Sequence, residues 1–144
     1  MINVTSGVIN QDRFDVNVTD GVIGTGIQGR FVAPTSVGET TKYDFVANAP
    51  VAFAIWTESN KNGTGGFTED ANYLKKVAVL NGHYIAETDQ YTGTPAVGDK
   101  LKTDAEGKLA VASGSDNVVA TVLEAPHSRP YLGSTVTVIK IKVN

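Results

Sequence analysis

The chain has two histidines, His83 and His127, which are the first side chains to consider for metal binding or acid–base chemistry. His83 precedes Glu87 and Asp89, whereas His127 lies in the proline-bounded segment PHSRP. A transition-metal site needs three or four suitable ligands, and the chain has no cysteine to supply one. The spacing favours turn or surface positions for both histidines, and we expect no metal site.

Two short segments, TEDANY (68–73) and ETDQYTG (87–93), each carry two carboxylates. A glycosidase pair needs a set separation and one raised pKa, and an EF-hand needs a D-x-D-x-D-G loop. Neither segment shows these features. Ser113, Ser115 and Ser128 lie in turn-like segments without a G-x-S-x-G elbow. We therefore expect no catalytic residues and no enzyme activity.

The segment GTGIQG (24–29) matches the dinucleotide pattern G-x-G-x-x-G. That fingerprint needs a helix after the glycines, so that the helix N-terminus faces the pyrophosphate. Here the strand-like RFVAP follows, which predicts a bulged β connection and no cofactor.

Trp56 could be a ligand platform, but its place in the apolar run VAFAIWT (51–57) favours a core position.

Composition limits the remaining classes. The 144 residues are 41% hydrophobic and 19% charged, with a net charge of −3. No basic run exceeds Lys75-Lys76, which argues against nucleic acid as a partner. The first residues lack a basic and then apolar leader, and no apolar run approaches the roughly 18 residues of a membrane span. We expect a protein made in a cytoplasm, with no membrane partner.

Hydrophobic periodicity indicates strands. RFDVNV (13–18) alternates, RFVAP (30–34) reads as a short strand that Pro34 stops, and 51–57 reads as a strand buried on both faces. Residues 68–76 are the only helix candidate.

Turn residues mark the later strands. Asn81-Gly82 predicts a tight hairpin, and Asp104 to Gly107 predicts a type I turn. The strand after residue 117 is expected to end at Pro126. In TVTVIKIKVN the apolar parity switches after Val138, which predicts a bulge or a strand buried differently at its two ends.

These elements predict a mainly β fold, a small barrel or sandwich of about ten short strands. The chain reads as a single β domain, 1–144. Two subdivisions stay open: an extended arm over 1–12, and a looser part 13–66 before a tighter barrel 67–144.

The segment PAVGDKLKTDAEGKLAVASGSDNVVATVLEA (95–125) resembles the decoration, or cement, proteins of tailed bacteriophage capsids. The first matching residues form a hairpin: Val97, Gly98, Asp99, Leu101, Asp104, Gly107, Lys108 and Leu109. The next strand supplies Val119, Ala120, Val122, Leu123, Glu124 and Ala125. TVTVIKIKV takes the place of the closing strand. Residues 1–94 match no pattern of that family.

The resemblance implies a structural protein on the capsid exterior that bridges major capsid subunits, more often as a trimer than as a dimer, without catalytic residues. The alternative is a tail, fibre or adhesin module that binds a glycan or another virion protein, with Trp56 or Tyr131 exposed. On either view the partner is a protein or a glycan.

The apolar residues of the N-terminal segment are candidates for a partner interface. An extended arm could add a strand to a partner's open sheet edge, or the segment could be the first strand of the chain's own sheet. Both alternatives stay open. On the first, the interface residues are Ile2, Val4, Val8, Ile9 and Phe14.

Overall fold

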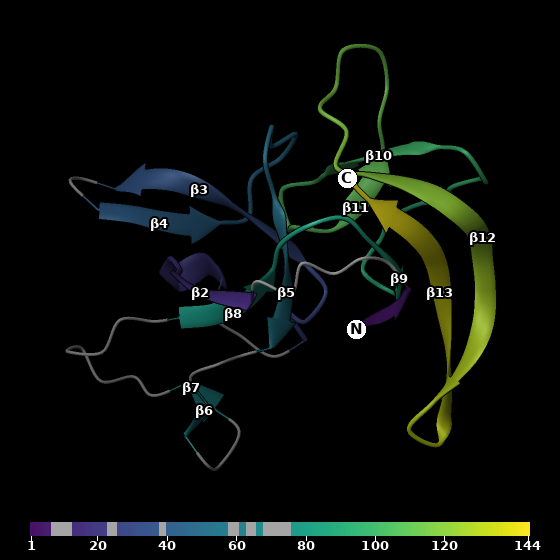
Figure 1. Ribbon diagram of the computed structural model, residues 1–144, viewed down its shortest axis with the longest axis horizontal. Coiled ribbons are helices and arrows are strands. Elements are labelled where there is room, and N and C mark those ends of the chain that lie inside the picture. Colours follow the sequence, from purple (N-terminus) through teal and green to yellow (C-terminus); the bar gives the residue numbers. More distant parts are fainter. Residues whose placement is uncertain (7–12, 23–25, 38–39, 58–60, 63–65, 68–75) are drawn as a thin grey trace.

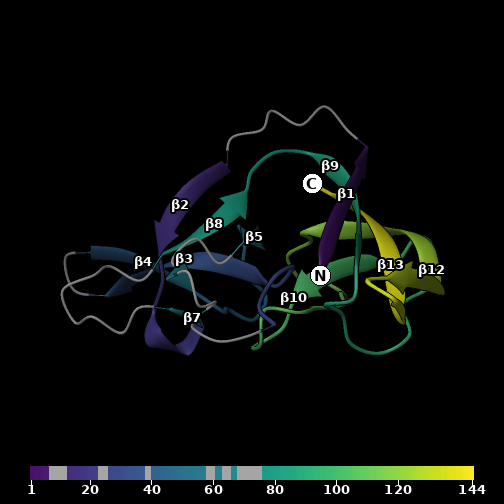
Figure 2. The ribbon, with the colours of Figure 1, turned by 90° about the horizontal axis from the view of Figure 1, so that it is seen from below.

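The computed structural model describes residues 1–6, 13–22, 26–37, 40–57, 61–62, 66–67 and 76–144. Antiparallel strands dominate this part of the chain, as the sequence predicts (Figure 1). The two large sheets occupy opposite halves of the molecule (Figure 2) and form a sandwich-like arrangement. The predicted mainly β fold is therefore confirmed, in its sandwich form.

The larger sheet has six strands in the order β1-β9-β13-β12-β10-β11. Their bounds are β1 Ile2–Ser6, β9 Tyr84–Thr88, β13 Ser134–Val143, β12 Ala120–Tyr131, β10 Lys100–Thr103 and β11 Leu109–Val111. The central strand β13 pairs with β9 on one side and with β12 on the other. The resemblance segment and the closing strand thus form four neighbouring strands of one sheet.

The second sheet has five strands in the order β2-β8-β5-β3-β4. Their bounds are β2 Arg13–Asn17, β8 Lys76–Leu80, β5 Phe53–Thr57, β3 Phe31–Val37 and β4 Thr40–Asp44. A 3-10 turn, η1 (Asp20–Val22), follows β2, and β6 (Lys61–Asn62) pairs with β7 (Gly66–Phe67).

The edges of this sheet approach one another without closing into a barrel. Val18, just after β2, forms a single bridge with Tyr43 of β4, and Thr19 N donates to Tyr43 O at 3.1 Å. β8, at residues 76–80, belongs to the same sheet as β2, β3, β4 and β5. The two sheets therefore do not correspond to a division of the chain into 13–66 and 67–144.

The middle of the five-stranded sheet is buried on both faces. On β5, Ala54 packs in the core between the two sheets, whereas its neighbour Ile55 packs in a second cluster inside the curled sheet. Phe31 and Val32 of β3 divide in the same way. Both faces of β5 are fully buried at Ala54 and Ile55, as predicted for the run 51–57. Phe53 and Trp56 are partly buried, and Val51 lies before the strand and is exposed, so the prediction holds only for the centre of the run.

The predicted turn at residues 104–107 is also confirmed, and it is packed against the other sheet. Gly107 N donates to Asp104 O at 3.1 Å, and Asp104 Oδ1 accepts from the backbone N–H groups of Glu106 and Lys108. Gly107 has φ of 74°, and a Cβ at this position would lie 2.7 Å from the carbonyl oxygen of Phe31. Glycine is therefore needed for both its conformation and its small size.

The hairpin predicted at Asn81-Gly82 does not form. β8 ends at Leu80 in one sheet and β9 begins at Tyr84 in the other, so this segment crosses between the sheets. A two-residue hairpin turn of the Asn-Gly type needs φ above zero at both residues. Gly82 has φ of 103°, but Asn81 is not among the positive-φ residues.

Two prolines expected to end strands lie inside them. β3 runs through Pro34 to Val37, and β12 runs through Pro126 to Tyr131. Proline cannot donate to a ladder, but beyond Val32 and Val122 these strands have one described partner each, β4 and β13. On the open side the missing N–H costs no hydrogen bond.

The switch of apolar parity in β13 reflects a strand that is buried differently at its two ends, which is one of the two predicted explanations. Val138 and Ile139 are adjacent and both buried, while the register shifts fall between Val122 and Glu124 and between Glu124 and His127. In both shifts β12 carries the extra residue, so the bulges lie in the neighbouring strand.

The helix predicted over 68–76 falls at 68–75 outside the described residues, and Lys76 begins β8. Within the described residues, no helix is long and apolar enough to cross a membrane.

Candidate functional site

The hairpin of β12 and β13 extends past the end of β9 (Figure 1), and its tip carries the most exposed large apolar side chain among the described residues. Tyr131 and Ser134 pair around a two-residue turn, Leu132-Gly133, whose φ angles are 47° and 80°. Two positive φ values match the right-handed twist of the flanking strands. Leu132 is 87% exposed and Tyr131 40% exposed, so the hairpin tip presents apolar surface to solvent.

A buried carboxylate anchors this hairpin to the sheet. Glu87 of β9 is 4% exposed. Arg129 Nη1 of β12 lies 2.6 Å from its Oε1 and 2.5 Å from its Oε2. A buried charge is tolerated only with a partner of this kind. The pair joins β12 to a strand that is not its neighbour in the sheet.

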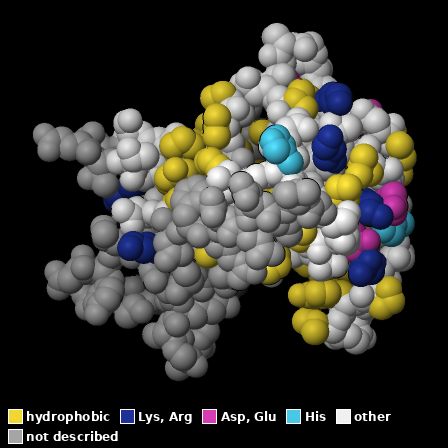
Figure 3. Space-filling model, in the orientation of Figure 1, with side chains coloured by type: hydrophobic (Ala, Val, Ile, Leu, Met, Phe, Trp, Pro, Cys, Tyr) yellow, Lys and Arg dark blue, Asp and Glu magenta, His cyan; other side chains and the backbone are white. Residues whose placement is uncertain are grey.

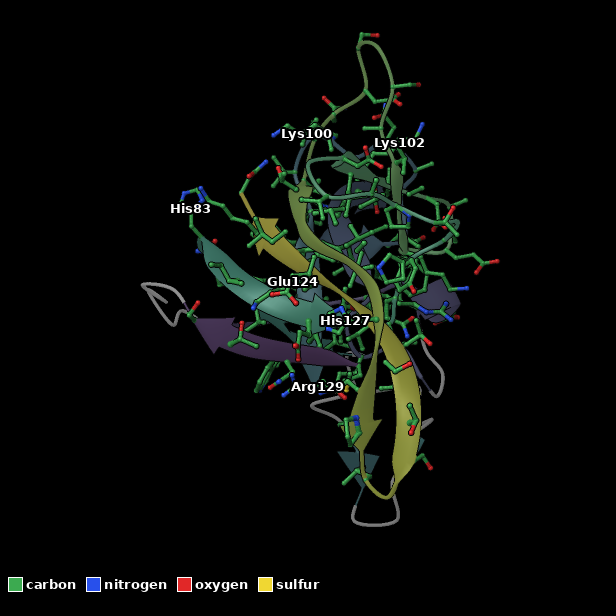
Figure 4. All side chains as sticks on the ribbon, turned by 90° about the vertical axis from the view of Figure 1, so that its right-hand side faces the viewer. His83, Lys100, Lys102, Glu124, His127 and Arg129 are labelled. Carbon is green, nitrogen blue, oxygen red and sulfur yellow. The ribbon has the colours of Figure 1, made fainter. Side chains whose placement is uncertain are left out.

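His127 and Glu124 lie beside this pair on β12 (Figure 4). His127 Nδ1 lies 2.9 Å from the carbonyl oxygen of Ala125, and Nε2 lies 3.9 Å from Glu87 and 3.8 Å from Glu124. Lys140 Nζ donates to Glu124 Oε1 at 2.7 Å. That hydrogen bond is the main reason the pKa of Glu124 is lowered, and the positive charge of Lys140 adds to it.

This cluster is built to hold strands together. Each of its carboxylates is already bound to a cation, and its strand positions form one row: Glu124 pairs with Lys140 and Lys140 pairs with Glu87. Among the described residues, no group of three or more histidine and acidic side chains is arranged to hold a metal ion.

A basic row crosses the same outer face nearer the end of β13. The register places Lys100 of β10 opposite Thr121 of β12, and Thr121 opposite Lys142 of β13. Lys100 and Lys142 are exposed, because the neighbouring residues Leu101, Ile141 and Val143 point into the core. His83, at the start of β9, is exposed at the same end of the sheet as Lys100 (Figure 4).

A groove opens between the two sheets at this end. Its volume is about 340 Å³, and apolar side chains dominate its lining. The lining residues that matter here are Val51, Phe53, Leu80, Val118, Val119 and Val143. Figure 3 shows hydrophobic, basic and histidine side chains gathered on the upper right of the molecule.

A second cavity, about 380 Å³, lies between the start of β1 and the hairpin tip. Asn3, Arg129, Pro130 and Tyr131 contribute to its lining, together with Met1, Ile2 and Leu132. It combines a guanidinium, an amide and an aromatic ring.

Of the five residues predicted as a partner interface, Ile2 and Val4 lie in one sheet and Phe14 lies in the other. Ile2 is 3% exposed in the core, where it pairs with Thr88, and Val4 packs against the same core. Residues 2–6 are thus the first strand of the chain's own sheet, which is one of the two alternatives. As a consequence Ile2 is not available to a partner. Phe14 pairs with Val79 through its backbone, and Val8 and Ile9 lie outside the described residues.

The two carboxylates of ETDQYTG (87–93), Glu87 and Asp89, form separate contacts. Glu87 binds Arg129, whereas Asp89 Oδ1 lies 2.5 Å from the Met1 nitrogen and accepts from Gln90 Nε2 at 2.8 Å. The segment TEDANY is at residues 68–73, outside the described part of the chain.

His127 and Ser128 were placed in a loop by sequence, and that placement is wrong: both lie within β12. The segment after GTGIQG leads directly into β3, as expected. There, a Cβ at Gly29 would lie 2.6 Å from the Met1 carbonyl oxygen. Trp56 is half-buried against the main core, which agrees with its preferred assignment.

Sequence reasoning missed Arg129, Lys142 and Lys100. For Lys142 and Lys100 a signal was present, because alternation with Ile141, Val143 and Leu101 assigns them to the outer face.

No family model matches the chain, and no curated protein matches it.

Proposed function

We propose that the chain is a structural virion protein that binds the outer surface of a phage capsid and stabilises the shell by bridging major capsid subunits. The observation that carries the proposal is the arrangement of the resemblance segment. Residues 100–143 supply β10, β11, β12 and β13, four adjacent strands with an exposed outer face and an apolar hairpin tip.

The matching residues form the frame of that unit. Gly98 has φ of 91° and donates from its backbone N–H to Val122 O at 2.9 Å, and Asp99 Oδ2 accepts from Ala96 N at 2.8 Å. Asp104 and Gly107 build the turn that packs on Phe31. The motif therefore fixes a rigid platform and leaves its outer side chains for contact.

Shell stabilisation needs a modest interface at each copy. About 800 Å² per partner is the usual size of a specific contact. A protein that binds the assembled lattice and not its free subunits stabilises the lattice by mass action. Many copies on one particle, as trimers or dimers on the capsid exterior, multiply a small energy per copy.

The test uses capsids assembled without this chain. Purified protein is expected to sediment with mature capsids, to raise their melting temperature, and to occupy symmetry-related outer positions in an electron-microscopy map. Wild-type protein that stays in the supernatant at saturating concentration would refute the proposal.

A second function, a tail, fibre or adhesin module that binds a surface glycan, is favoured by the cavity beside Tyr131. Exposed aromatic rings with nearby polar groups suit sugars, and Arg129 and Asn3 line the same cavity. Saturable signals on a glycan array that Tyr131→Ala abolishes, together with no capsid binding, would select this function.

A further inference from the structure

The groove at the end of β13 is apolar inside and reaches solvent. Val51 is 52% exposed, and Val118 is also exposed, while Leu80, Val119 and Val143 form the buried wall. A volume of about 340 Å³ is at the lower end of the range, about 300–1,000 Å³, of sites that hold small ligands. It therefore suits one or two side chains and is too small for a helix.

The outer face next to this groove carries two lysines, Lys100 and Lys142, that form no ion pair with a described residue. Three described carboxylates on this sheet are bound by a cation: Glu87 by Arg129, Glu124 by Lys140 and Asp116 by Lys102. Asp99, which precedes Lys100, accepts a hydrogen bond from Ala96 N. Lys100 Nζ bonds only to the neutral Thr121 hydroxyl, and Lys142 forms no ion pair with a described residue. Neither lysine therefore forms an ion pair with a described carboxylate, on a chain whose net charge is −3.

These cations lie near the groove but are not among its lining residues, and the two lysines are on the outer face of the sheet. Lys142 precedes Val143, whose side chain lines the groove, and Lys100 lies two strands away in the same row. His83 follows Gly82, another lining residue, and is exposed. Strands are about 4.8 Å apart, so the two lysines are separated by about 10 Å across the sheet.

We propose that this groove receives a segment of the major capsid protein in which an apolar side chain is flanked by carboxylates. The inference rests on the proposed function and names the chemistry of its contact. The apolar side chain fills the space between Val51, Val118 and Val143, and the carboxylates face Lys142, Lys100 and His83. Opposite charges of this kind steer association and fix the register of a contact. Two lysines are too few for a nucleic-acid footprint, which needs several phosphate contacts.

The experiment measures binding of full-length variants to capsids assembled without this chain. Lys142→Glu reverses one charge, and Val118→Asp places a carboxylate at the groove. Lys42→Glu, on β4 of the other sheet, is the matched charge control. Circular dichroism and urea unfolding establish that each variant is folded.

We expect Lys142→Glu and Val118→Asp each to weaken capsid binding at least tenfold, and Lys42→Glu to change it less than twofold. Raising NaCl from about 50 mM to about 300 mM, which shortens the screening length, is expected to weaken the wild type more than Lys142→Glu. Wild-type binding that Lys142→Glu leaves unchanged overturns this inference alone. Absence of wild-type binding overturns the proposed function as well, so the two failures are distinguishable.

Discussion

Arg129 of β12 binds Glu87 of β9 across the strand that separates them. The two residues belong to strands that never pair, and β13 lies between. The ion pair therefore fixes how the long hairpin curls over the sheet, and with it the position of the apolar tip at Leu132.

Replacing Arg129 with methionine tests this anchor. Glu87 would then keep a buried charge without its partner, and such losses cost about 3–5 kcal/mol in fully buried pairs. Because the Arg129 side chain is 42% exposed, water screens part of this cost, and we expect about 2 kcal/mol in urea unfolding. Lys140→Met removes the cation from exposed Glu124 and should cost under about 1 kcal/mol. Equal effects of the two variants would contradict the anchor.

Gly107→Ala tests the contact between the 104–107 turn and the other sheet. The new Cβ would meet the Phe45 ring and lie 2.7 Å from Phe31 O, at a φ of 74°. Overpacking and strain together are expected to cost about 3 kcal/mol. Gly114→Ala has a φ of 55° and open space, so it should cost about 1 kcal/mol. The difference in urea midpoint between Gly107→Ala and Gly114→Ala measures the cost of packing the new methyl group against Phe45 and Phe31. Equal midpoints would show that the turn is not closely packed against the other sheet.

These two sites show what the sequence could and could not predict. The 104–107 turn is a local pattern of Asp and Gly, so it was predictable from four residues. The Arg129–Glu87 pair depends on two bulges in β12 and on the burial of an outward-facing glutamate, and neither leaves a local pattern.

At Asn81-Gly82 the sequence carries a strong local hairpin pattern, but no hairpin forms there. Leu80 pairs with Ala54 in one sheet, and Tyr84 pairs with Val143 in the other. Tertiary pairing of these flanking residues decided the path, and the turn chemistry followed it. Likewise Ile2 was predicted as interface from its exposure in an assumed arm, and its burial comes from pairing with Thr88, far along the chain.

Thr103→Val tests a buried hydroxyl that ties the 46–49 loop to β10. Thr103 Oγ1 donates to Val46 O at 2.6 Å and accepts from Ala49 N at 3.0 Å. Valine keeps the shape but leaves both backbone groups without this partner, so we expect a loss of about 2 kcal/mol in urea unfolding. Thr137→Val, an exposed change on β13, should stay within about 0.5 kcal/mol. A neutral Thr103→Val would show that the loop has other support.

Tyr84 predicts a dependence on alkaline pH. Burial raises the pKa of its hydroxyl above the ordinary value of 10.0. The unfolded chain therefore ionises this phenol first, so its contribution to stability is complete below pH 10 and is lost as pH rises above it.

Tyr84→Phe removes that titration. The urea midpoint of the variant is expected to fall less steeply above pH 10 than that of the wild type. At pH 7 the variant should be as stable or more stable, because the hydroxyl has no hydrogen-bond partner among the described residues. A wild-type slope retained by the variant would assign the alkaline loss to other groups.

The position of β13 has a consequence for synthesis. This strand follows every other strand that the structure describes, yet it lies at the centre of the six-stranded sheet. Until residues 134–143 leave the ribosome, β9 and β12 each expose an edge that only β13 can cover. Premature termination before this point would release chains with two unpaired edges, which are templates for aggregation.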